Sequence, residues 1–466
     1  MDQATGAIDR QRLRSVKARE DERFARNHPA SMALLARARR SMPRGVPMQW
    51  MASTYGHPPV FSADGKGAHF RCVDGHRYLD MGLALLVNFG GYAPAPVVSA
   101  VTRQLRRGSH FALPAEDAIY VAEELSNRFG LPSWQFTLSA TLANAEAIRL
   151  ARAATGRERI LLFDGKYHGH LEQTMQIIVD GETRPEYLGL ARNAGASTSI
   201  VQFNDLPAVE TMLARDDVAC VLTEPAMTLE RTFLPEPGFH TGLRTLTRRA
   251  GTLLVLDETH TQTQHYGGLT KGLGTEARHP RARQVAWRRH SNWCLRDDQA
   301  PGRRPGGAWW RPGRRLRRGS VRRPADRGAG NGRHMFANAL SMAAARAALE
   351  HVYTEEAYAR THSLGERMAR GIGAIIEHRG LPWSVVRLFN RAGYQFSEDP
   401  PRNAIEQRAA EDPELSDALR IYMLNRGVWE AGGWANPVAS VAHTAADIDR
   451  YLEVLDGAIG DLAVRG

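Results

Sequence analysis

The chain has 466 residues, 43% of them hydrophobic and 24% charged, as in a globular protein with room for roughly two or three domains. No run of about 18 apolar residues predicts a transmembrane helix, and the polar N-terminus lacks a signal-peptide core, so we expect a cytoplasmic protein without membrane contact. Its three cysteines are scattered without metal-ligand spacing, which predicts neither a metal site nor a disulfide framework.

The net charge of +11 comes from one segment. Residues 277–334 hold 17 Arg and three Asp, a charge of +14, which leaves −3 for the rest of the chain. A case for whole-protein binding to nucleic acid or acidic membranes therefore fails, and only this Arg-rich window carries such a possibility.

The N-terminal part begins with a basic helical arm over residues 1–45, which we interpret as a solvated surface helix that ends at the turn Met42–Pro47. Asp74-Gly75 lies between two alternating runs in residues 70–80 and predicts a hairpin.

Helices and buried-type strands alternate from there to residue 260. The pattern predicts helices over 97–105, 115–128 and about 139–154, strands over 159–164 and 218–225, and a strand with the apolar run 253–256. This alternation favours a mainly parallel α/β sheet with right-handed crossovers. After Met335 we expect a helix over 338–351 and then a smaller α+β domain, with clear helical pieces at 371–376 and 446–461.

Asp257 follows an unbroken apolar run, Leu253 to Leu256, which is typical of a strand buried on both faces. Ligands of such sheets bind beyond the carboxyl ends of the strands, so Asp257 is a candidate site residue, although a capping role is as plausible on this stretch alone. Ser139 and Thr141 begin a helix whose free N–H groups suit a phosphate, and simple N-capping is here the favoured alternative.

The order of these motifs resembles one family. Ser-x-Thr at a helix start, Tyr-His-Gly after a strand, Glu-Pro after a strand and Asp-Glu-x-x-Thr after a strand are similar to class III (fold type I) pyridoxal-phosphate aminotransferases, near the glutamate-1-semialdehyde aminomutase branch. The resemblance implies a large domain over 76–345 with a mainly parallel sheet, a small α+β domain over 346–466, and an arm and small-domain segment over 1–75. It also implies a homodimer that acts on a small-molecule amino donor and acceptor.

The resemblance also assigns roles to individual residues. Ser139, Ala140 and Thr141 correspond to the motif that holds the cofactor phosphate, although Ala140 replaces a glycine and Leu142 a glutamate. Tyr167 corresponds to the aromatic stacked on the pyridine ring, and His168 shapes the same loop. Asp257 corresponds to the carboxylate that keeps the ring nitrogen protonated, Thr259 would lie under the ring, and Glu224 is a second acid near the cleft.

The lysine that this chemistry needs is missing. It forms the Schiff base and moves the proton, and the family places it in Gly-Lys-Ser-x-Gly-Gly-Gly, somewhat under thirty residues after the aspartate. The chain contains four lysines, none in that context: Lys17, Lys66, Lys166 and Lys271. The expected position, near Gln284, falls inside the Arg-rich window, so the sequence supplies no catalytic lysine.

The window has too few large apolar residues to fold, and we expect it to be irregular. Its codons, chosen freely and read from the second base, nevertheless yield family motifs in order. Arg283-Gln-Val285 gives Gly-Lys-Ser, the following Trp287-Arg-Arg289 gives Gly-Gly-Gly, residues 293–299 begin with Gly-Ala-Tyr-Gly, and residues 330–334 end in Gly-Gly-Thr. We interpret residues 277–334 as a frame-shifted translation that also removed the phosphate-binding Thr of the partner subunit, now read as His334.

Three functions remain open at this point. The chain is a PLP-dependent aminotransferase impaired by the loss of its lysine, or a non-catalytic PLP-binding relic, or, least favoured, a nucleic-acid binder through clusters such as Arg314–Arg318. The sequence does not name the amino donor or acceptor. Aromatic residues near Met48–Tyr55 and Trp429–Trp434 are candidates for lining a substrate pocket, and ordinary core packing explains them equally well.

Overall fold

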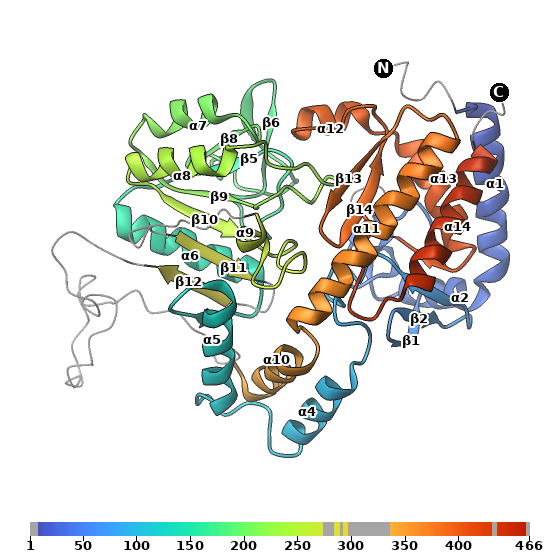
Figure 1. Cartoon of the computed structure of the whole chain (residues 1–466), viewed down its shortest axis with the longest axis horizontal. Coiled ribbons are helices and arrows are strands. Elements are labelled where there is room, and N and C mark those ends of the chain that lie inside the picture. The colour runs from blue at the N-terminus through green and yellow to red at the C-terminus, as the bar shows by residue number, and fades with distance from the viewer. Residues whose placement is uncertain (1–7, 274–283, 289–291, 297–335, 431–435, 463–466) are drawn as a thin grey trace.

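The computed structural model describes residues 8–273, 284–288, 292–296, 336–430 and 436–462. In this part of the chain the centre of the larger unit is a sheet of seven strands in the order β4-β12-β11-β10-β9-β5-β8 (Figure 1). The strands are β4 Gln135–Phe136, β5 Arg159–Phe163, β8 Thr198–Val201, β9 Val218–Thr223, β10 Leu253–Asp257, β11 Gln284–Arg288 and β12 Asn292–Arg296. The run from β11 to β8 is parallel, whereas β12 pairs antiparallel with β11 and β4. The prediction of a mainly parallel sheet is confirmed.

Helices cover both faces of this sheet because its central strands are apolar on both sides. Alternate residues of β5, β9 and β10 pack against α6 (Ala140–Thr155), and the residues between them pack against α7 (Leu206–Leu213) and α8 (Phe239–Arg249). All of β9 and β10 is buried, as the unbroken apolar runs predicted.

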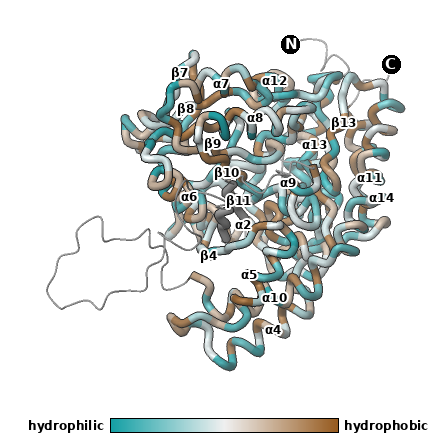
Figure 2. The backbone as a smooth tube through the Cα atoms, turned by 60° about the vertical axis from the view of Figure 1, so that its left-hand side comes forward, coloured by the Kyte–Doolittle hydropathy of each residue, from teal (hydrophilic) through white to brown (hydrophobic). Residues whose placement is uncertain are grey.

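Three helices stand together at one end of the molecule, beside the sheet (Figure 2). They are α4 (Ala95–Leu105), α5 (Glu116–Phe129) and α10 (Ala339–His351), and α10 packs against both of the others. The short α9 (Leu269–Gly272) follows the Asp257 segment.

The smaller unit combines the two ends of the described chain (Figure 1). Its helices are α1 Arg10–Asn27, α2 Pro29–Ala38, α3 Trp50–Ser53, α11 Glu355–His378, α12 Ala404–Ala410, α13 Pro413–Leu424 and α14 Ala445–Leu462, with a 3-10 turn at Pro43–Gly45. Its strands are β1 Ser62–Lys66, β2 His69–Cys72, β3 Arg77–Asp80, β13 Ser384–Leu388, β14 Arg391–Gln395 and β15 Val428–Trp429. A separate hairpin, β6 Gln176–Val179 and β7 Glu182–Pro185, extends from the larger unit. The predicted hairpin at Asp74-Gly75 joins β2 and β3, and Gly75 has the positive φ (85°) that such a turn requires.

The interpretation of residues 1–45 as a solvated surface helix was wrong for α1. Leu13, Val16, Glu20 and Phe24 recur at helical spacing and are buried, and Leu13 and Val16 join the core formed by α11, α13 and α14. The charged residues between these four positions mask this buried stripe in the sequence. Because α1 packs on the C-terminal helices, the first and last described segments form one core.

Part of the Arg-rich window also has regular structure. β11 and β12 lie inside it, and β11 pairs with β10 so that Asp257 lies opposite Trp287 and Leu254 opposite Gln284. The expectation of an irregular segment therefore does not extend to these ten residues. The physical reason is that the backbone of β10 offers N–H and C=O groups on its open edge, and a strand of almost any sequence satisfies them. The rest of the window lies outside the described residues.

Candidate active site

Two acidic side chains lie side by side at the carboxyl edge of the sheet. Leu256 of β10 is the register partner of Thr223 of β9, so Asp257 and Glu224 follow as neighbours at the two strand ends. Both are almost fully buried, at 2% and 3% exposure. A buried carboxylate needs hydrogen-bond donors or a proton, and the two acids meet this need differently.

Asp257 is held as a carboxylate by four hydrogen bonds. Its Oδ2 accepts from His168 Nδ1 at 2.8 Å and from Asn144 Nδ2 at 2.9 Å. Its Oδ1 accepts from the amide and the hydroxyl of Thr259, at 3.0 and 2.5 Å. Burial alone would raise the pKa of Asp257, but these bonds, led by the one from His168, outweigh it and hold that pKa well below its usual range.

Glu224 has the opposite environment. Burial raises the pKa of Glu224 to about 8, against the hydrogen bond from the Thr228 hydroxyl and with the help of the Asp257 charge. Thr228 Oγ1 also lies 3.0 Å from His260 Nδ1, so Glu224, Thr228 and His260 form a short polar chain. The buried guanidinium of Arg391, from β14 of the smaller unit, acts on Glu224 through its charge. At neutral pH, therefore, one acid is charged and its neighbour is protonated.

The start of α6 and the loop after β5 meet next to Asp257. Ser139 is the N-cap of α6 and accepts from the Leu142 amide at 3.2 Å, as the N-cap alternative predicted. One residue past Ala140, Thr141 Oγ1 accepts from the amide of His170 at 3.3 Å. Gly169 has a φ of 86°, and a Cβ there would lie 2.2 Å from Thr141 Oγ1. Only glycine lets the loop approach the helix start so closely.

The predicted residues occupy this region to different degrees. His168, Asp257 and Thr259 are joined directly by hydrogen bonds, and Thr141 belongs to the adjoining helix start. Tyr167 precedes His168 in the loop, with 39% of its surface exposed and its ring edge-on to that of His170. Tyr167 and His168, which bonds Asp257, are thus adjacent residues of the loop after β5.

Asn144 is the site residue that the sequence reasoning missed. Its Nδ2 bonds both Asp257 Oδ2 and the His168 carbonyl, at 2.9 and 3.0 Å, and the side chain is fully buried. An asparagine on the buried face of an amphipathic helix was the available signal, since such a side chain needs partners.

Lys166 and Lys271 each donate to a backbone carbonyl in the described structure. Lys166 is buried in the Tyr167 loop, but its Nζ donates to the Gln176 carbonyl at 2.5 Å and lies 3.7 Å from Glu186. Lys271 Nζ donates to the Arg128 carbonyl at 3.3 Å. The missing lysine is expected near Gln284, the first residue of β11. Gln284 pairs with Leu254 of β10, three residues before Asp257.

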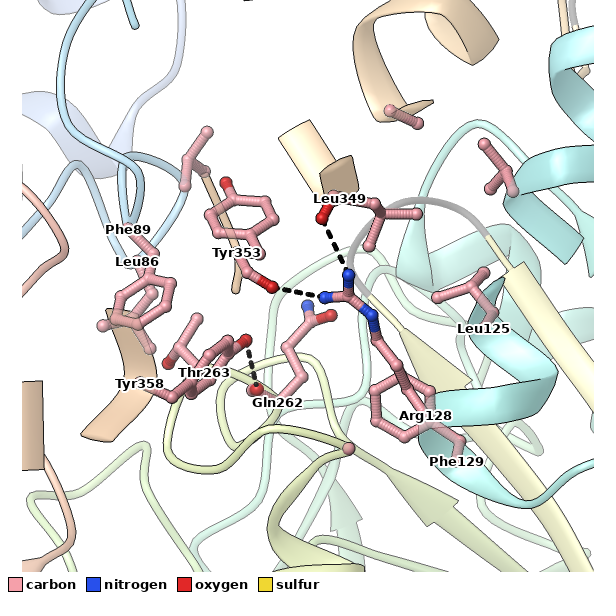
Figure 3. Close-up of a pocket in the computed structure, with 14 residues that line it drawn as sticks. Leu86, Phe89, Leu125, Arg128, Phe129, Gln262, Thr263, Leu349, Tyr353 and Tyr358 are labelled. Carbon is pink, nitrogen blue, oxygen red and sulfur yellow. Dashed lines mark hydrogen bonds between the residues drawn. The ribbon is translucent and has the colours of Figure 1, made fainter. Parts of the chain in front are cut away.

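A small, mostly apolar cavity of about 110 Å³ lies where α5, α10 and the segment after β10 meet (Figure 3). Arg128 forms part of its wall and donates from Nη2 to the Leu349 carbonyl at 2.7 Å and from Nη1 to that of Tyr353. The first carbonyl is in the last turn of α10 and the second lies just beyond the end of the helix, so Arg128 caps α10. Gln262 and Thr263, a few residues after Asp257, form the opposite wall, where Tyr358 donates to the Gln262 carbonyl at 3.2 Å.

The sequence model of class-III aminotransferases matches residues 50–268, a stretch that ends before the Arg-rich window. The glutamate-1-semialdehyde 2,1-aminomutase of Chloroflexus aggregans is 30% identical over 455 residues, which cover 95% of this chain and 99% of that protein. The chain belongs to the class III aminotransferase family.

Other relatives agree with this membership. The enzyme of the same name from Desulfitobacterium hafniense is 31% identical over 441 residues, covering 91% of this chain and 96% of that protein. A crystal structure of a glutamate-1-semialdehyde-aminomutase from Pseudomonas aeruginosa PAO1, in complex with PMP, is 33% identical, with a TM-score of 0.85 over 98% of this chain and all of that one. An omega-transaminase from Sphaerobacter thermophilus, 24% identical with a TM-score of 0.79, shares the fold. The class III chain thus has the fold type I architecture that its motifs predicted.

In the described ranges of this class III chain, no helix is both long and apolar enough to cross a bilayer. Within the same residues no three His, Cys, Asp or Glu side chains are grouped as metal ligands.

Proposed function

We propose that this chain binds pyridoxal 5'-phosphate at the Asp257 site and descends from an enzyme that transfers an amino group between an amino acid or amine and a keto acid or aldehyde. The observation that carries the proposal is the network around Asp257, which keeps a buried carboxylate charged beside a helix N-terminus. The donor set fits the cofactor: a fixed negative charge suits a protonated ring nitrogen, and free N–H groups with the Ser139 and Thr141 hydroxyls suit a phosphate.

Each of these residues has a distinct task. His168, Asn144 and Thr259 hold Asp257 ionised and oriented. Of their contacts, a ring N–H most easily displaces the one from the Thr259 hydroxyl, because that hydroxyl can rotate away. Gly169 keeps the loop against the helix start, and Tyr167 offers a ring face from the same loop. When bound, the cofactor supplies an electron sink for negative charge that develops at the substrate carbon.

The activity of the chain depends on whether it has a lysine that forms the Schiff base. We infer that the chain as written holds the cofactor without a covalent link, because the amines of Lys166 and Lys271 are engaged by backbone carbonyls outside the Asp257 network. Without a lysine the proton-transfer step also lacks its base. The ancestral reaction is therefore impaired, and the frame-shift interpretation of residues 277–334 explains why.

The binding test is an absorbance titration of the purified protein with pyridoxal 5'-phosphate, followed by borohydride reduction and peptide mapping. We expect saturable binding that dialysis reverses, and no reduced adduct. A stoichiometric adduct on Lys166 or Lys271 would contradict the non-covalent proposal, and no saturable binding at all would remove the cofactor assignment.

The gene provides the second test. Sequencing codons 270–340 should reveal Gly-Lys-Ser in the second frame across Arg283–Val285. A chain with that frame restored should bind the cofactor covalently and release a keto acid or aldehyde from an amino donor in a single half-reaction. Nucleotides that encode no such motif end the frame-shift hypothesis while leaving the binding proposal intact.

We also propose a homodimer. Exposed apolar side chains occur on α4 and α5, which both pack against α10: Val98, Leu105 and Ile119 are 46%, 55% and 61% exposed. A monomer rarely leaves several such residues uncovered on neighbouring helices.

A further inference from the structure

Arg420 of α13 is a buried cation with an unsatisfied edge. Its side chain is 3% exposed, and Nη1 donates to the backbone carbonyl of Glu430. Nε and Nη2 are both buried and have no hydrogen-bond partner among the described residues. Burial lowers the pKa of Arg420 to about 10, so the group stays charged at neutral pH. A buried charge left in this condition costs several kcal/mol, which makes a missing anionic partner the simplest explanation.

Two aromatic rings lie against this guanidinium. Its Cζ lies 4.0 Å from the ring centre of Tyr55 and 4.8 Å from that of Trp429. The two rings meet edge-to-face, 5.2 Å apart, although one comes from the N-terminal segment and the other from β15. These are the two segments whose aromatic residues the sequence suggested as a substrate pocket. Cation–π attraction offsets part of the burial cost but satisfies no N–H group.

The unsatisfied edge has a specific shape. Nε–H and Nη2–H lie in the guanidinium plane and project in parallel from one edge of it, the arrangement that binds both oxygens of a carboxylate. The ring of His57, which stacks with that of Tyr55, adds a buried Nε2 that has no partner in the described chain. Two unpaired polar groups next to apolar ring faces match a ligand that has both a carboxylate and an apolar body.

The acids that face Arg420 do not fill this edge. Glu430, Asp417 and Asp80 act on it through charge alone. Asp80 is occupied, because it accepts from the amides of Gly82 and Leu83 and from the Tyr92 hydroxyl. Glu430 keeps its Oε1 unpartnered in the described structure, so it has not formed the ion pair that would make Arg420 purely structural.

We propose that the free edge of Arg420, beside Tyr55 and Trp429, is a binding site for the carboxylate of a small organic acid with an apolar body. Carboxylate binding stands on the geometry alone. Identifying the ligand as the substrate, an amino acid or 2-oxo acid, rests on the proposed function.

The test compares 3-phenylpropionate with the uncharged 3-phenylpropanol by calorimetric titration of the purified full-length chain. We expect the acid to bind and the alcohol to bind at least about tenfold more weakly, the size expected for a charge-assisted bidentate contact. Arg420→Gln should lose the preference for the acid, and Arg420→Lys, which keeps the charge without the fork, should retain only part of it. The surface variant Arg450→Gln is the matched control and should behave as the parent does.

A second measurement covers the case in which the Arg420 variants fail to fold. Trp429→Phe keeps an aromatic wall, and it should retain calorimetric binding while losing the change in tryptophan fluorescence that the acid induces in the parent. Equal binding of acid and alcohol, an unchanged acid affinity in Arg420→Gln, or a fluorescence change that survives in Trp429→Phe would each overturn the proposal.

Cofactor binding is followed separately by absorbance in the same proteins. If Arg420→Gln loses the preference for the acid but binds the cofactor normally, the carboxylate site is distinct from the cofactor site. Acid binding in a parent chain that fails to bind the cofactor would refute the proposed function and leave this site standing.

Discussion

His168 Nδ1 donates to Asp257 Oδ2 across 2.8 Å, and both side chains are buried. Since an ionised carboxylate only accepts hydrogen bonds, this contact fixes the proton on Nδ1 and leaves His168 Nε2 facing the interior without a partner in the described residues. The pair joins the loop after β5 to the end of β10, so the conformation of the loop and the charge of the acid depend on each other.

Asp257→Asn should weaken the binding of pyridoxal 5'-phosphate by about 10- to 100-fold, because the variant loses a charge-assisted hydrogen bond to the ring nitrogen. An absorbance titration at pH 7 measures the change. Asp205→Asn is the control, since Asp205 caps α7 and asparagine caps equally well. Equal affinities in Asp257→Asn and the parent would mean that the cofactor does not use this carboxylate.

Glu224→Gln should change how stability depends on pH. The pKa of Glu224 is raised to about 8 in the folded chain, above its ordinary value of 4.5, so the folded state binds the proton more tightly than the unfolded state. The stabilising effect is complete below about pH 4.5 and is lost as the pH rises through about 8. Thermal unfolding should therefore find the variant more stable than the parent at pH 8.5 but not at pH 4.5, and parallel profiles would contradict the assignment of a neutral Glu224.

Arg128→Met should destabilise the protein by about 2–4 kcal/mol, because the half-buried carbonyls of Leu349 and Tyr353 at the end of α10 lose a charged donor and Glu124 loses its partner. Urea unfolding provides the measurement. Arg26→Met removes an exposed helical ion pair with Glu22 and should cost less than about 0.5 kcal/mol. Similar costs for the two variants would show that the Arg128 contacts do not hold α10.

Leu105→Glu with Ile119→Glu should convert a dimer into a monomer, because it places charges on the apolar surface of α4 and α5 without disturbing the core. Sedimentation at micromolar concentration detects the change. Ile405→Glu, on the equally exposed α12 side chain, should leave the dimer intact. If the parent sediments as a monomer, the homodimer proposal is wrong.

The sequence by itself determined the features that repeat along the chain or stand in fixed order. The apolar runs of β9 and β10 predicted two-sided burial because a strand covered on both faces has no polar side to alternate with. The order of short motifs predicted the family, and counting lysines alone revealed that the expected amine is missing.

Only the tertiary structure decided which distant side chains meet. Asn144 reaches Asp257 across 113 positions of the chain, and Arg420 contacts both Tyr55 and Trp429, because sheet order and the packing of α1 and α13 bring remote segments together. The sequence also did not predict the burial of one face of α1. Charges at the intervening positions lower the local hydrophobicity without changing which face packs. Local periodicity sets what a segment can form, whereas partners across the fold set which of its polar groups are paired and which are left open for a ligand.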